Sequence, residues 1–287
     1  MIGAYFTYWA EQYNADYDHC IRKAAALGFD AIGVRGTGIV EFSDEKKKST
    51  RKLAEDLGLT MNFVAALADK DISSPDATAR RQAIEYIKRI VDAVAVMKGD
   101  ILAGSFYANW HSTLPVGVTD KTPWLERSAE SMREICNTAS DNGVRISLEI
   151  LNRYESFLLN TAAEGVAYVE RVGCDNLGLL LDTFHMNIEE DTLPGAIETA
   201  GRLLTHFHVG EANRDVPGPH GHIDWPAVFA ALRRVGYAGI VEFEPFVTMG
   251  TEIGKNVCLW RDLSGGMDLD EKMRRSLAFV KQRMAEA

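Results

Sequence analysis

The stretch LGLLLDTFHMNIEEDTLPGAIETAGRLLTHFHVG, residues 177–210, contains one strand–helix–strand unit. Residues 177–182 form an apolar run that favours a buried strand, and residues 192–203 have the pattern of a helix. Residues 204–210 return to a strand pattern in which polar and apolar side chains alternate. Two strands joined through a helix are typical of a parallel sheet.

The same unit recurs in both directions along the chain. We expect strands at residues 2–8, 29–34, 59–67, 100–106, 144–150, 177–182, 204–210 and 239–244. We expect helices at residues 16–28, 44–58, 77–99, 122–143, 162–173, 192–203, 225–236 and 268–285. Strict alternation favours a parallel α/β sheet. Eight units in 287 residues predict a single (β/α)8 TIM barrel over residues 1–287.

Two further patterns bear on this fold. Six expected helices end in a glycine just before the next strand, which predicts left-handed C-caps at Gly28, Gly58, Gly99, Gly143, Gly173 and Gly236.

An open, doubly wound sheet is the alternative architecture. It usually carries a glycine-rich nucleotide loop after its first strand, and here that position reads YFTYWAEQ.

Composition excludes several classes of function. The formal charge is −10 and the 31 basic residues form no long cluster, which disfavours nucleic acid as a partner. No apolar run is long enough to span a membrane, and the first residues lack a signal-peptide pattern. The four cysteines form no CxxC pair, which suits a reducing compartment. We therefore expect a cytoplasmic protein with no membrane or nucleic-acid partner.

Polar side chains end four successive strands of the expected barrel. They are Glu149, Asp182, His208 and Glu244, separated by 33, 26 and 36 residues, or about one strand–helix unit each. In a TIM barrel these ends meet at the C-terminal face, where the active site lies. Three carboxylates that converge in a partly dry pocket repel one another, and a divalent cation removes that penalty. Mixed carboxylate and imidazole ligands favour Mn²⁺, with Co²⁺ or Mg²⁺ as alternatives.

The strand register also predicts the layer below these four residues. Counting back two positions on each strand gives Ser147, Leu180, His206 and Glu242. His206 is therefore expected beneath the metal rather than on it. A buried carboxylate needs a partner, and we expect Glu242 to pair with His206 on the neighbouring strand.

More polar and aromatic groups surround the expected metal site. Glu155, His185 and Arg214 follow strands five, six and seven. They supply donors and acceptors suited to hydroxyls and a carbonyl. At other strand ends, Tyr5 and Trp110 are candidates for apolar walls against a sugar.

The motifs that carry these residues resemble the ketose 3-epimerases, the D-tagatose and D-allulose 3-epimerase family within the xylose-isomerase-like barrels. They are LEILNRYESFLLNTAAEG, LDTFHMNIEEDTL, HFHVGEANRDVPG, EPFV and VCLWRDLSGG. The resemblance spans nearly the whole chain. It implies that the four strand-end residues bind the metal and that Glu155, His185 and Arg214 orient the substrate. It also implies a homodimer or homotetramer.

The family reaction inverts C3 of a free ketohexose, as between D-fructose and D-allulose or D-tagatose and D-sorbose, through a cis-enediolate. The resemblance assigns the two acid–base roles to Glu149 and Glu244 and places the metal on O2 and O3. Three alternatives stay open. They are another sugar isomerase of the superfamily, such as an aldose–ketose isomerase, an L-ribulose 3-epimerase or a hydroxypyruvate isomerase-like enzyme; a metal-dependent phosphodiesterase; and a non-catalytic sugar-binding barrel.

Overall fold

The computed structural model describes residues 1–287 and contains a closed barrel of eight parallel strands. The strands are β1 (Ile2–Tyr5), β2 (Ala31–Arg35), β3 (Thr60–Ala66), β4 (Ile101–Ser105), β5 (Arg145–Glu149), β6 (Leu177–Asp182), β7 (Leu204–Val209) and β8 (Val241–Phe243). Each strand pairs with its neighbours in chain order, and β1 closes the ring against β8. The predicted (β/α)8 barrel is confirmed, and the open sheet is excluded.

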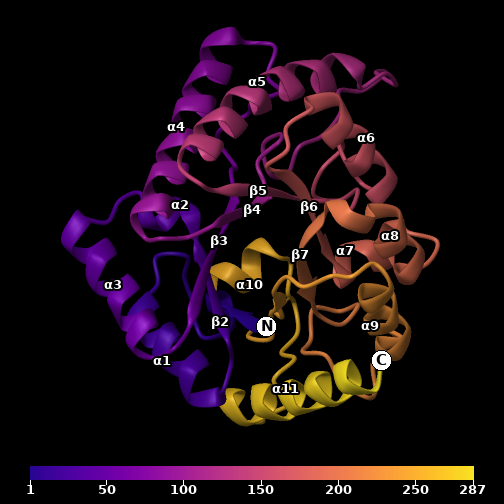
Figure 1. The fold of residues 1–287 in the computed structure, drawn as a ribbon. Helices are drawn as coiled ribbons and strands as arrows, with labels where there is room; N and C mark the ends of the chain where they lie inside the picture. Colours follow the sequence, from indigo (N-terminus) through magenta and orange to yellow (C-terminus); the bar gives the residue numbers. More distant parts are fainter.

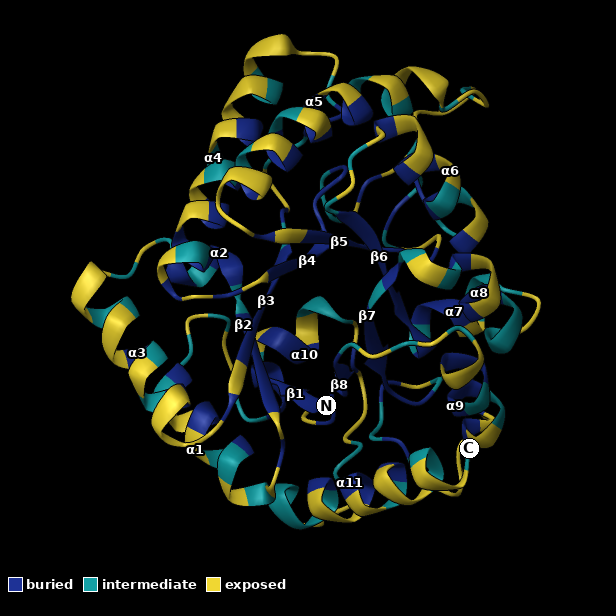
Figure 2. Cartoon of the chain, viewed as in Figure 1, coloured by how far each residue is buried: buried dark blue, intermediate teal, exposed yellow.

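Helices surround the barrel and bury one face each against it (Figures 1 and 2). They are α1 (Tyr17–Leu27), α2 (Gly36–Ile39), α3 (Asp44–Asp56), α4 (Ala77–Val96), α5 (Thr122–Asp141), α6 (Ala162–Val172), α7 (Thr183–Glu189), α8 (Leu193–Ala200), α9 (Trp225–Arg234), α10 (Glu252–Asn256) and α11 (Leu269–Glu286). Two 3₁₀ turns, η1 (Phe6–Tyr8) and η2 (Gly201–Leu203), complete the set. No helix is long and apolar enough to cross a membrane.

Three of these helices lie outside the predicted pattern. The short helices α2, α7 and α10 follow β2, β6 and β8 at the C-terminal face, and α10 lies across the barrel in Figure 1. The predicted first strand is too long, because η1 replaces its last three residues. These residues are buried although they are not strand, so an apolar pattern alone could not separate them from β1.

Five of the six predicted glycine caps have positive φ, and Gly99 is the exception. Lys98 takes the left-handed conformation there, with φ of 56°. Gly99 is needed for space instead, because a Cβ at this position would lie 2.3 Å from the Phe63 ring.

A bulge between β6 and β7 sets the side chains that β7 presents to the barrel interior. Leu179 pairs with Leu204, whereas Leu180 pairs with His206, so Thr205 is an extra residue in β7. The Thr205 hydroxyl lies 2.8 Å from the Ser147 hydroxyl. Beyond the bulge, Asp182 pairs with His208 at the mouth of the barrel. Bulges are common beside functional sites, where they redirect side chains.

The last helix supports the C-terminal face from outside the barrel. The hydroxyl of Tyr8, just after β1, donates to the carbonyl of Leu269 at 2.8 Å. Lys272 forms an ion pair of 2.8 Å with Asp215 in the loop after β7. Helix α11 therefore contacts the segments that follow β1 and β7 and links them to each other.

Candidate functional site

Four side chains from the ends of β5 to β8 converge at the C-terminal face. One potential ligand atom from each of Glu149, Asp182, His208 and Glu244 lies within 4.8 Å of the others, and all four residues are buried. Glu149 and Asp182 are the last residues of their strands, His208 is the penultimate residue of β7, and Glu244 directly follows β8. The structure thus brings together the four residues that the strand ends predicted.

Electrostatics in this group are unbalanced without a cation. Burial, followed by the negative charge of Glu244, raises the pKa of Glu149 well above its ordinary value. Burial also opposes the charged form of Glu244, but His208 and Arg214 outweigh it and hold the pKa of Glu244 below its usual value. Without a cation, the surroundings of Glu149 therefore oppose its ionisation, whereas those of Glu244 favour it.

The donor set fits a divalent cation. Burial opposes the imidazolium form of His208, yet Glu244 and Glu242 outweigh it and raise the pKa of His208 well above normal. Its Nδ1 is buried without a hydrogen-bond partner, 3.8 Å from Glu149 Oε1 and 3.5 Å from Glu244 Oε2. A cation bound between this nitrogen and the two carboxyl groups would balance their negative charge, and His208 Nδ1 is available as one of its ligands.

Arg214 links the four residues to the groups around them. Its Nη1 donates to Asp182 Oδ2 at 2.8 Å and to Glu244 Oε2 at 3.1 Å. Its guanidinium packs 3.7 Å from the centroid of the Phe184 ring and 5.1 Å from that of Phe246. Arg214 has φ of 68°, a conformation that costs energy in a non-glycine residue and is often found at functional sites.

His185 and Glu155 are held in fixed orientations by Asn152. The backbone N–H of Asn152 donates to His185 Nδ1 at 3.2 Å, so the proton of the neutral ring lies on Nε2. Burial, then the charge of Arg214, lowers the pKa of His185 to about 4, which keeps the ring neutral. Glu155 accepts hydrogen bonds from Asn152 Nδ2 at 3.1 Å and from Trp110 Nε1 at 2.9 Å.

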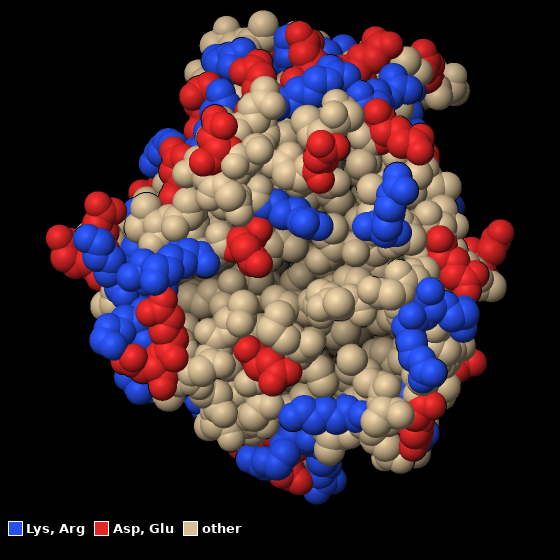
Figure 3. Space-filling model, in the orientation of Figure 1, with Lys and Arg blue, Asp and Glu red and all other residues tan.

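One cavity of about 290 Å³ at the barrel mouth is lined by five of these residues, Glu149, Glu155, His185, Arg214 and Glu244. Tyr5 and Trp110 also line it, as expected from the sequence, and the Tyr5 ring stacks 6.4 Å from the His208 ring. The face seen in Figure 3 is hollowed near its centre, and its acidic and basic side chains are interspersed.

The sequence did not point to several residues of this site. Asn152 stands in the quoted LNRYES motif, but its hydrogen bonds to two neighbours appear only in the fold. Arg35, at the end of β2, lines the cavity and packs 4.6 Å from the centroid of the Tyr13 ring. Thr7 and Thr37 also line it, and their buried hydroxyls have no hydrogen-bond partner. The signal that could have identified Arg35 was its position, because it is a polar residue at the end of a strand.

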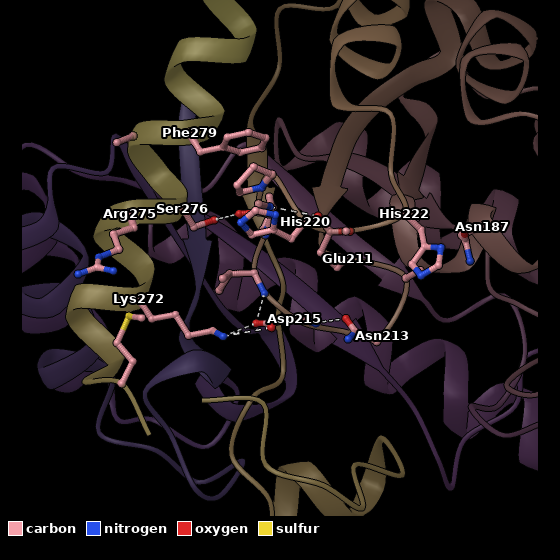
Figure 4. A pocket seen from close by; sticks show the side chains of 18 of the residues that line it. Asn187, Glu211, Asn213, Asp215, His220, His222, Lys272, Arg275, Ser276 and Phe279 are labelled. Atoms are coloured by element: carbon pink, nitrogen blue, oxygen red, sulfur yellow. Dashed lines mark hydrogen bonds and ion pairs between the residues drawn. The ribbon is translucent and has the colours of Figure 1, made fainter. Parts of the chain in front are cut away.

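A larger cavity, of about 1000 Å³, lies behind the loop after β7 and against α11. Figure 4 shows Glu211 between the rings of His220 and His222, with Lys272 reaching Asp215. The two histidines are exposed and belong to no potential metal group. Two members of the converging group, Glu149 and Glu244, line the smaller cavity.

Comparisons with known proteins show relatives along the whole chain. Residues 21–282 match the family described as xylose isomerase-like TIM barrel. A D-psicose 3-epimerase of Agrobacterium fabrum is 42% identical over 283 residues, 97% of each chain. An L-ribulose 3-epimerase of Mesorhizobium japonicum is 35% identical over 91% of this chain and 87% of its own.

Solved structures agree with these matches. A crystal structure of D-psicose 3-epimerase in the presence of D-fructose has a TM-score of 0.94 at 41% identity, covering 98% of both chains. The D-psicose 3-epimerase from Clostridium cellulolyticum H10 with D-tagatose also has a TM-score of 0.94, at 39% identity over 98% of both chains.

Proposed function

We propose that this chain inverts C3 of free ketohexoses. The premise is that it belongs to the xylose isomerase-like TIM barrel family and is a carbohydrate epimerase of its ketose 3-epimerase group. The proposed substrates are of the D-fructose/D-allulose and D-tagatose/D-sorbose type. The observation that carries the proposal is the convergence of Glu149, Asp182, His208 and Glu244 within 4.8 Å, beside a ligand-sized cavity that Glu149 and Glu244 line.

We propose that these four residues hold one divalent ion, with Mn²⁺ as the first choice and Co²⁺ or Mg²⁺ as alternatives. When bound, such an ion would act as a Lewis acid and would stabilise the negative charge that develops as the substrate loses its C3 proton. The four residues that would hold it come from the ends of successive strands of the barrel. Support for this site comes from the buried, unpartnered Nδ1 of His208.

Inversion at C3 needs a proton acceptor on one face and a proton donor on the other. Glu149 and Glu244 come from β5 and β8, which are separated by two strands, so their carboxyl groups approach the cavity from different directions. In the proposed reaction, the ionised carboxylate takes the C3 proton and leaves an enediolate across C2 and C3. The protonated carboxyl returns a proton to the opposite face, so no net oxidation or reduction occurs.

The residues next to the acids position the substrate. The Nε2–H of neutral His185 and the guanidinium of Arg214 are donors suited to the O1 and O2 oxygens, and Glu155 is an acceptor for the O1 hydroxyl. At the other end of the cavity, Arg35 and the hydroxyls of Thr7 and Thr37 are suited to the hydroxyls beyond C3. Arg35 therefore belongs to the proposed site as a residue that determines which ketose binds.

Isotope exchange tests this function. The protein is incubated with D-fructose and Mn²⁺ in D₂O, and the products are analysed by NMR and chromatography. We expect D-allulose to form and deuterium to enter at C3, with no exchange in a sample kept free of metal by a chelator. Aldose formation would instead indicate an aldose–ketose isomerase, and no exchange on any ketose would refute both.

We also propose that the protein is a homodimer or homotetramer. The candidate interface is the motif that contains Leu259 and Trp260. In the monomer Leu259 is only 7% exposed, so it packs within its own chain, whereas Trp260 is 69% exposed and free to contact another copy. Light scattering of the wild-type protein and of Trp260→Ala measures the oligomeric mass, and a monomeric wild type would refute this proposal.

A further inference from the structure

Glu242 is a fully buried carboxylate one layer below the proposed metal site. It lies on β8, two residues before Glu244, and its exposed fraction is 0%. A carboxylate in this environment is costly unless N–H groups satisfy it. Its Oε2 lies 2.8 Å from Asn62 Nδ2, 3.0 Å from His206 Nε2 and 3.2 Å from His208 Nε2. Three donors from β3 and β7 thus meet at one oxygen, and the pair predicted between Glu242 and His206 is part of this cluster.

Gly33 on β2 leaves room for the carboxylate, and only β1 lies between that strand and β8. A Cβ at Gly33 on β2 would lie 2.1 Å from Glu242 Oε1, so any larger residue there would displace the carboxylate. The φ of Gly33 is not in the positive range, so the backbone alone does not require glycine at this position. The space that the Glu242 carboxylate occupies explains why β2 has a glycine at position 33.

We propose that Glu242 is a positioning residue that orients His208 for the metal. By accepting the Nε2–H of His208, its carboxylate leaves the lone pair of Nδ1 free. That Nδ1 is the atom that faces Glu149 and Glu244 at 3.8 and 3.5 Å. A carboxylate behind a metal-binding histidine selects the tautomer, holds the ring angle and makes the ligand nitrogen more basic.

His208 is held on its other sides as well. The Tyr5 ring stacks on it at a centroid distance of 6.4 Å, and the His206 ring meets it edge-on at 5.0 Å. With both neighbours packed against the ring, the contact to Glu242 decides which nitrogen carries the proton.

A second metal ion is the competing reading of this cluster. His206, His208 and Glu242 also form a group whose potential ligand atoms lie within 4.8 Å of one another. Separations of 3.0 and 3.2 Å from the two Nε2 atoms to Oε2 are those of hydrogen bonds, in which protons occupy the space between the atoms. We therefore assign the cluster to orientation of the ligand, and metal stoichiometry tests the choice.

Three substitutions separate this role from general stability. Glu242→Leu removes the acceptor, Glu242→Gln keeps an acceptor oxygen without the charge, and Gly33→Ala pushes the carboxylate away without altering any ligand. Glu190→Gln is the control, since Glu190 accepts a hydrogen bond from the backbone N–H of Ala162, outside the site. Mn²⁺ affinity is measured from the EPR signal of the free ion, so the readout does not depend on turnover.

We expect Glu242→Leu to weaken Mn²⁺ binding by about 10–100-fold, Glu242→Gln and Gly33→Ala to weaken it less, and the control to match the wild type. In protein with ¹⁵N-labelled histidine and ¹¹³Cd²⁺, we expect scalar coupling from cadmium to Nδ1 of His208. Unchanged affinity in all three variants, coupling through Nε2, or two ions per chain would each overturn the inference.

The inference rests on the metal site of the proposed function, and the experiment separates the two. Failure of the wild-type chain to bind any divalent ion would overturn both. Normal binding and normal C3 exchange in the wild type, together with unchanged affinity in the variants, would overturn the role of Glu242 alone.

Discussion

Replacing Arg214 with methionine tests whether its positive charge stabilises the buried carboxylates of Asp182 and Glu244. Arg214 is 6% exposed and pairs with Asp182 at 2.8 Å and Glu244 at 3.1 Å. Methionine keeps an apolar side chain between the rings of Phe184 and Phe246 but removes the charge. Loss of one partner from a buried ion pair costs about 3–5 kcal/mol. Two charge-assisted hydrogen bonds at about 1.5–3 kcal/mol each give a similar sum.

We expect this loss in full only when the metal is absent. In a chelator, Arg214→Met leaves two buried carboxylates without their cationic partner, and the melting temperature should fall by about 6–20 °C, at about 2–4 °C for each kcal/mol. With saturating Mn²⁺ the fall should be clearly smaller, because the ion supplies positive charge to the same carboxylates. Scanning calorimetry of both samples measures the difference.

The control for this experiment is a surface pair of the same chemistry. Arg234 contacts Glu198 at 2.6 Å, and both side chains are about half exposed, at 54% and 50%. Arg234→Met should cost less than about 1 kcal/mol, because solvent screens exposed pairs. If Arg214→Met melts within about 2 °C of the wild type in chelator, or loses as much stability with Mn²⁺ as without it, then Arg214 does not balance the metal-binding carboxylates as argued.

Three further predictions follow from the same geometry. Glu149→Gln and Glu244→Gln should each lower the epimerisation rate by about 10²–10⁴-fold, measured as conversion of D-fructose to D-allulose; retained conversion in either variant would show that its carboxyl group does not move the proton. Arg35→Leu should raise KM for the ketose by about 10-fold or more while kcat changes little, because it removes a charged hydrogen bond to the far end of the substrate; steady-state kinetics would contradict this if KM stayed constant. Gly104→Ala should destabilise the fold by about 2–4 kcal/mol, since Gly104 has φ of 121° and its Cβ would lie 2.0 Å from the Ala65 carbonyl oxygen; a calorimetric melting temperature equal to that of the wild type would count against it.

The strand-end residues could be predicted because barrel topology alone brings them together. Parallel strands in chain order end at one face, so Glu149, Asp182, His208 and Glu244 converge whatever the exact helix packing. The bulge at Thr205 lay outside this reasoning. The predicted pair of His206 and Glu242 is still confirmed, at 3.0 Å, because counting back from His208 within one strand does not depend on pairing between strands.

Contacts across the barrel could not be predicted in the same way. Asn62 on β3 meets Glu242 on β8 at 2.8 Å, and which residues meet across the interior depends on strand tilt and stagger. Arg214 packs against Phe184 and Phe246, and these contacts depend on the loops after β7 and β8, whose conformations no periodic pattern describes. Cavity residues such as Arg35 and Thr37 become visible only when the short helix α2 is placed at the mouth.

The closure of β1 on β8 has a consequence for how the protein is made. Ile2 pairs with Val241, so one edge of the first strand has no partner until the ribosome has synthesised most of the polypeptide. A nascent chain that stops before β8 and α11 would already contain Glu149, Asp182 and His208, yet it would expose an open sheet edge that invites association with other chains. The closed cavity can therefore form only after β8 has been synthesised.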